Sequence, residues 1–183
     1  MDDFFRLLAS MSADSSELSE NIVKQHSKML EKMKSKMERM ENRLLRSKSL
    51  PKEVRKLIVA ARIGNHSKCS GILVKGTDVN SRGASNETAL CAAASGGHSN
   101  LLNLLLEYGA DVNASDDDGD TPLMYAVMAD ELGFIKSLVT ICADKVDINA
   151  KNKSGKTGIE MAFKSGKEKI VKFLSQRNAK FDC

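Results

Sequence analysis

The sequence contains no tryptophan, only two prolines and, as its remaining aromatic residues, only six Phe and two Tyr among 183 residues. A core with so few rings must be built from Leu, Ala, Ile, Val and Met, which is commoner in helical packing than in sheets. The two prolines, Pro51 and Pro122, leave long stretches of the chain free to be helical. These absences favour an all-α protein.

Long apolar runs are absent as well. No segment of about 18 apolar residues is available to span a membrane, and the acidic start MDDFFRLLAS lacks the basic n-region of a secretion signal. Four cysteines stand far apart, with no CxxC pair and no histidine cluster near them: Cys69, Cys91, Cys142 and Cys183. We therefore expect a cytoplasmic or nuclear protein without disulfides, metal or cofactor.

The net charge of +4 is unevenly distributed. Residues 1–56 hold 13 Lys and Arg against 9 Asp and Glu, residues 57–150 hold 6 against 12, and residues 151–183 hold 9 against 3. Nucleic-acid binders usually present a continuous basic face, whereas the middle of this chain is acidic. The pattern predicts no nucleic-acid partner and favours a protein partner.

Catalytic motifs are not found. The three histidines, His26, His66 and His98, have no nucleophile or acid–base partner near them, and HExxH, GxSxG and phosphate-binding glycine loops are absent. The acidic run Asp116–Asp120 departs from the EF-hand pattern because no glutamate closes a 12-residue loop. Its Asp116 and Gly119 fit an exposed turn instead. Because no catalytic motif is found, we predict a non-enzymatic protein.

An internal repeat is the strongest positive signal. A threonine recurs after 33 and then 36 residues, and an Asp-Val-Asn or Asp-Ile-Asn triplet recurs with the same two steps. Two independent anchors that keep one period are poorly explained by chance. The positions are Thr88, Thr121 and Thr157 for the threonine, and Asp78–Asn80, Asp111–Asn113 and Asp147–Asn149 for the triplet.

Each repeat unit reads as two short helices. In the clearest unit, Thr88 is suited to cap a first helix, and Gly97 is suited to end it, because glycine tolerates the left-handed conformation. Residues 101–106, LLNLLL, then predict a second helix, which Gly109 closes. Neither helix hides its apolar residues alone, so stacked units must bury them together.

At this point the sequence resembles the ankyrin-repeat family, on the motif DDDGDTPLMYAV and on residues 87–114. The resemblance implies an all-α solenoid of about four helix-turn-helix units within residues 51–183. Residues 1–50 are expected, from their own pattern, to form a helical extension before it. The third unit is longer by three residues, which fits Asp144–Val146 in its loop, and Asn86 stands where a turn glycine is expected. The expected units are 52–82, which looks like an N-terminal cap, 83–115, 116–151 and 152–183.

Within the extension, residues 19–47 carry about three apolar heptads, with Val23, Leu30, Met37 and Leu44 at one core position. Three interpretations are open. The segment is a lone amphipathic helix, a short coiled coil that joins two chains, or a basic helix that binds a groove or a membrane surface.

The resemblance implies a protein-interaction module or adaptor whose partner, unidentified here, contacts the turn tips and the inward face of each first helix. The alternatives are a structural protein that self-assembles through residues 19–47, and an inhibitor resembling ankyrin regulators of transcription factors. Asn113 also resembles an asparagine that is hydroxylated in some ankyrin proteins, its other interpretation being a structural role in the turn. Matched position by position, the predicted contact residues are Arg62, Glu87, Asp117, Asp118, Asp120, Met124, Tyr125, Met128, Lys153 and Lys156.

Overall fold

The computed structural model describes Glu31, residues 50–177 and Ala179. Glu31 is helical and exposed. The other predictions for the N-terminal extension, including pairing of two chains through residues 19–47, lie outside the described residues. Residues 50–177 belong to one compact unit.

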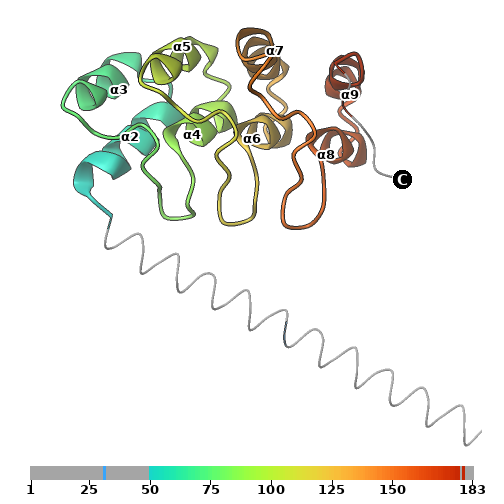
Figure 1. The fold of residues 1–183 in the computed structure, drawn as a ribbon, viewed down its shortest axis with the longest axis horizontal. Coiled ribbons are helices and arrows are strands. Elements are labelled where there is room, and N and C mark those ends of the chain that lie inside the picture. The colour runs from blue at the N-terminus through green and yellow to red at the C-terminus, as the bar shows by residue number, and fades with distance from the viewer. Residues whose placement is uncertain (1–30, 32–49, 178, 180–183) are drawn as a thin grey trace, which may run out of the picture. The chain divides into compact units, whose positions relative to one another are not determined.

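The described chain folds into four consecutive pairs of helices, with no strand beyond one isolated bridge between Lys151 and Thr157. The first helices of the pairs form one row and the second helices form another, and long loops extend from the row of first helices (Figure 1). We call these rows the inner and the outer helices. The inner helices are α2 (Lys52–Arg62), α4 (Ala89–Ser95), α6 (Pro122–Met128) and α8 (Gly158–Lys164), and the outer helices are α3 (His66–Leu73), α5 (Ser99–Glu107), α7 (Leu132–Ile141) and α9 (Glu168–Ser175).

The recurrent threonines begin three of the inner helices. Each is buried, and its side chain accepts a hydrogen bond from the backbone N–H three residues on, which satisfies one of the orphan donors of the first turn. At Thr157 the bond is reciprocal, since the Glu160 carboxylate accepts from the Thr157 N–H at 2.9 Å. The α2 helix begins instead after Pro51, without a side-chain cap.

Neighbouring units bury their apolar faces against one another. The α2 helix packs on α4, α4 on α6 and α6 on α8, while α3 contacts α5 and α5 contacts α7. The core is mostly aliphatic, and Phe134 is the one aromatic side chain among the largest fully buried residues of the described part. The prediction of an all-α repeat solenoid with an aliphatic core is confirmed.

Loop geometry follows the repeat as well. Asn86 takes a positive φ of 62°, in the place where Gly119 and Gly155 have φ of 80° and 71°. Asp144 and Lys145 lie in the turn that follows α7, where the Lys145 carbonyl accepts from the Asn113 amide as the Gly109 carbonyl accepts from the Asn80 amide one repeat earlier. Within the described part of the chain, no helix combines the length and the apolar character needed to cross a bilayer.

Candidate protein-recognition surface

Three hairpin loops join the four helix pairs and turn back in the same way. In each, the N–H of the first tip residue donates to the carbonyl four residues on: Gly83 to Glu87 at 2.8 Å, Asp116 to Asp120 at 3.1 Å and Asn152 to Lys156 at 3.0 Å. A second bond closes each tip at its residue of positive φ. We call residues 83–87, 116–120 and 152–156 the hairpin row, which extends from the inner helices in Figure 1.

Backbone hydrogen bonds connect the hairpins to one another. The Asp117 N–H donates to the Ser85 carbonyl at 3.0 Å, and the Lys153 N–H donates to the Asp118 carbonyl at 2.9 Å. The Lys153 ammonium also donates to the Asp117 carbonyl at 2.6 Å. A side chain on Gly119 would clash here, since an added Cβ would lie 2.8 Å from the Lys153 nitrogen. The three tips therefore hold one fixed spacing.

Asp116 organises the acidic tip of the third unit. One carboxylate oxygen accepts from the N–H groups of Asp118 and Asp120 at 2.9 and 2.8 Å, and the other accepts from the Tyr125 hydroxyl at 2.7 Å. Burial is the main cause that raises the pKa of Tyr125 well above its usual value, and the hydrogen bond to the Asp116 carboxylate raises it further. The hydroxyl therefore stays a donor. The bond fixes the hairpin to α6.

Asp120 lies half-buried between two hairpins. Its carboxylate accepts from the Asn152 side-chain amide at 2.8 Å. Burial raises the pKa of Asp120 above its ordinary value, and the Asp116 and Asp118 carboxylates raise it further, while the Asn152 bond opposes the shift. Asp120 thus links the third unit to the fourth.

The remaining predicted contact residues differ in how much surface they offer. Arg62 is exposed and donates to Glu87 at 3.1 Å, where the Glu87 side chain is only 13% exposed. Met128 is 46% exposed at the end of α6. Asp118, Lys153 and Lys156 are exposed, and Asp117 is half-buried. These residues all lie in the hairpin row or on the inner helices, but they do not form one enclosed site.

Met124, which the sequence predicts as a contact residue, does not lie on the surface. Met124 is 1% exposed, so its side chain belongs to the core and offers a partner nothing to touch. The error has a physical cause. Met124 lies in the first turn of α6, three residues after the capping Thr121. The equivalent residue of the preceding unit is Cys91, which is also buried. The Cys91 thiol lies 3.6 Å from the carbonyl of Ala114, and both residues are buried.

Asn113 bridges two units through its side chain. The amide donates to the Lys145 carbonyl at 2.7 Å, and the side-chain oxygen accepts from the Asp147 N–H at 2.9 Å. Asn80 makes the same two bonds one repeat earlier, to the Gly109 carbonyl and from the Asp111 N–H. A structural role therefore accounts for the Asp-Val-Asn triplet.

A further set of linking residues was missed from the sequence. The His98 ring nitrogen lies 3.0 Å from the carbonyl of Arg62, the last residue of α2. At the matching position of the fourth unit, the Lys167 ammonium donates to the Val127 and Met128 carbonyls at 2.7 Å each. Glu131 occupies this position in the third unit, against Gly97. The two-residue spacing from each inner helix's C-cap could have revealed them.

The acidic tip presents no metal site in the described residues, where no three His, Cys, Asp or Glu side chains converge as ligands would. Its Asp116 oxygens already accept three protein hydrogen bonds. What the surface offers is a fixed row of charged tips beside partly exposed inner-helix side chains. That arrangement suits recognition of another macromolecule.

Comparison with known proteins agrees with this geometry. A family model of ankyrin repeats in three copies matches residues 57–152. Human BCL-6 corepressor-like protein 1 is 36% identical over 141 residues, which cover 70% of this chain and 8% of that protein. The putative ankyrin repeat protein FPV031 of fowlpox virus (strain NVSL) is 28% identical over 129 residues, which cover 69% of this chain and 38% of that protein.

The mouse inactive serine/threonine-protein kinase TEX14 is 29% identical over 119 residues, which cover 63% of this chain and 8% of that protein. The chain thus spans less than two fifths of the length of each of these three relatives. It belongs to the ankyrin-repeat family. Ankyrin repeats are generally protein–protein interaction modules.

Proposed function

We propose that this chain is a non-enzymatic recognition module that binds a partner protein across the hairpin row and the exposed side chains of the inner helices. The supporting observation is the pair of backbone bonds between neighbouring hairpins, from Asp117 to Ser85 and from Lys153 to Asp118. Because these bonds fix the tips before a partner arrives, little conformational entropy is lost on binding.

Charge along the row indicates what the partner must carry. Asp118 is exposed at the middle tip, and Lys153 and Lys156 are exposed at the next tip. Met128 adds a half-exposed apolar side chain from α6, in the same unit as the middle tip. Interfaces commonly combine an apolar anchor with a charged rim. We expect a partner that sets a basic group against the middle tip and an acidic group against the last one.

The names of the relatives do not identify that partner. They concern a corepressor-like protein, an inactive kinase and a viral ankyrin repeat protein, which are different kinds of protein. Together with the small share of each that the chain covers, this variety supports a common scaffold that displays different surface residues. The partner must therefore be found by experiment.

The test is quantitative affinity capture from a cell lysate with three full-length chains. The first is unaltered, the second carries Asp118→Lys with Met128→Ala, and the third carries Glu107→Lys with Ile141→Ala. The third is the matched control, because Glu107 and Ile141 are also exposed but lie on the outer helices α5 and α7. We expect a protein that the first and third chains recover equally and that the second recovers at least tenfold less.

A circular-dichroism spectrum that is the same for all three chains establishes that the substitutions act on the surface. If the second and third chains recover every protein equally, the hairpin row and α6 are not the binding surface. A loss from the third chain alone would place recognition on the outer helices and contradict the proposal.

A further inference from the structure

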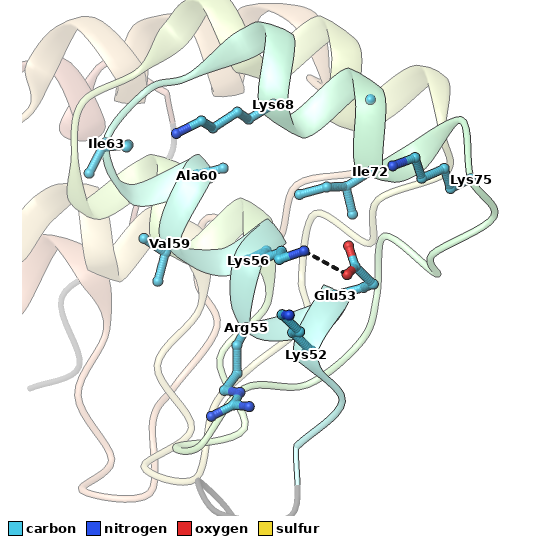
Figure 2. A pocket seen from close by; sticks show the side chains of 11 residues that line it. Lys52, Glu53, Arg55, Lys56, Val59, Ala60, Ile63, Lys68, Ile72 and Lys75 are labelled. Carbon is cyan, nitrogen blue, oxygen red and sulfur yellow. Dashed lines mark hydrogen bonds and ion pairs between the residues drawn. The ribbon is translucent and has the colours of Figure 1, made fainter.

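A groove of about 760 Å³ lies between α2 and α3, in the first helix pair of the described chain (Figure 2). Residues of this first unit alone line it. Its floor is apolar. Two floor residues, Val59 on α2 and Ile63 at its C-terminal end, are among the most exposed large apolar residues of the described chain. The floor consists of Val59, Ala60, Ile63 and Ile72, with Val59 at 58% and Ile63 at 59% exposure.

The repeat explains why this face is open. One repeat later, the position of Val59 is taken by Ala92, which is 1% exposed because α4 packs against α2. No described residue covers Val59 in the same way. An apolar surface of this kind is more stable when a further chain segment covers it.

Another stacked repeat does not fit the groove. Lys56 and Lys68 are exposed at the positions where the second unit has Ala89 and Leu101, both 0% exposed. A repeat stacked here would bury the Lys68 ammonium and the ion pair of Lys56 with Glu53, which is costly. A second copy placed groove to groove would oppose like charges in the same place.

The rim of the groove is strongly basic. It holds five cationic side chains and one carboxylate, Glu53, which lies 2.8 Å from Lys56. The aliphatic stems of lysine and arginine extend the apolar floor, while their charged ends point to solvent. The five cations are Lys52, Arg55, Lys56, Lys68 and Lys75 (Figure 2).

We propose that this end groove binds an acidic amphipathic helix of a partner protein. The apolar face of the helix covers Val59 and Ile63, and its carboxylates meet the rim lysines. Helix-in-groove recognition needs an apolar strip with anchors at spacings of three and four residues, and the charged rim sets the preference for an acidic ligand. The groove includes the inner helix α2, but no residue of the hairpin row or of α6 lines it, so the peptide test and the lysate capture can fail independently.

The probe is a fluorescein-labelled peptide of about 18 residues, or five helical turns, with leucines at i, i+3, i+4 and i+7 spacing and glutamates between them. Fluorescence anisotropy measures its binding to the full-length chain. We expect saturable binding that weakens as salt screens the rim. Ile63→Asp, and separately Lys68→Glu with Lys75→Glu, should each lower the affinity at least tenfold, which is about 1.4 kcal/mol.

The matched control carries Lys136→Glu with Lys169→Glu, which gives the same net charge as the rim variant but alters exposed residues on α7 and α9. It should bind within about twofold of the unaltered chain. If the control and rim variants lose affinity equally, the attraction is a general charge effect and the proposal fails. It also fails if the peptide shows no saturable binding.

A photo-crosslinking residue identifies what covers the floor. Ile63→p-benzoylphenylalanine in the full-length chain is irradiated with and without the peptide, and the products are mapped by mass spectrometry. An adduct between position 63 and the peptide supports the proposal. An adduct within the same chain, or between two copies, that the peptide does not displace shows a different occupant and overturns it.

Discussion

Replacing Asp116 with alanine is the substitution that best separates hairpin geometry from the rest of the repeat. Its carboxylate accepts three hydrogen bonds, from the Asp118 and Asp120 N–H groups and from the Tyr125 hydroxyl, at 2.7–2.9 Å. A net contribution of about 1 kcal/mol for each bond in a partly solvated turn gives a loss of about 3 kcal/mol in the free energy of unfolding. For a domain of this size, the melting temperature should fall on the order of 10 °C.

The matched control is Asp111→Ala. Asp111 is the first residue of the Asp111–Asn113 triplet, and its side chain accepts one hydrogen bond, from the Asn113 N–H at 2.9 Å. Its removal should cost about 1 kcal/mol. Tyr125→Phe should also cost about 1 kcal/mol, and the double substitution of Asp116 and Tyr125 should cost no more than Asp116→Ala alone, because both remove the same bond.

Urea unfolding followed by circular dichroism at 222 nm measures these differences. The reasoning is refuted if Asp116→Ala costs no more than Asp111→Ala. It is also refuted if the losses from Asp116→Ala and Tyr125→Phe add in full, since the bond between the two side chains would then contribute nothing.

Three further outcomes are expected. Burial raises the pKa of Asp120, so the stability it contributes when protonated is lost as pH rises through that pKa; Asp120→Asn should therefore raise the melting temperature at pH 7, with the gain vanishing below the ordinary pKa, and a gain independent of pH would contradict this. Glu131→Lys should add about 1 kcal/mol, because lysine at the position of Lys167 donates to the end of an inner helix; thermal melts should show no such gain for Asp144→Lys, an exposed control. Burial raises the pKa of the thiols of Cys69, Cys91 and Cys142. Iodoacetamide at pH 8 should therefore label these three residues in urea but barely in the native chain, and rapid native labelling of any one would refute its burial.

Much of the fold could be predicted from the sequence, because the repeat encodes backbone geometry. A capping threonine, a residue of positive φ and a bridging asparagine each perform one local task, so their spacing fixes two helices and a turn. Thr88 and Asn86 lie as predicted, and Asn113 makes the bonds that a structural role requires. The family match over residues 57–152 follows from the same positions.

The candidate site could be predicted only in part. Whether Met124 lies inside or outside depends on the direction in which the first turn of α6 faces, and that is set by the packing of neighbouring helices. The bond from Tyr125 to Asp116 joins side chains nine residues apart across a turn, so no periodic pattern announces it. The end groove depends on Val59 and Ile63 being left uncovered, which only the assembled stack reveals.

Hydrogen–deuterium exchange of the full-length chain, alone and with the captured partner, tests the recognition surface most directly. We predict that the partner slows exchange in the hairpin row, at residues 83–87, 116–120 and 152–156, and in α6, with little change in α5 and α7. Protection confined to the outer helices, or absent from all three hairpins, would contradict the account.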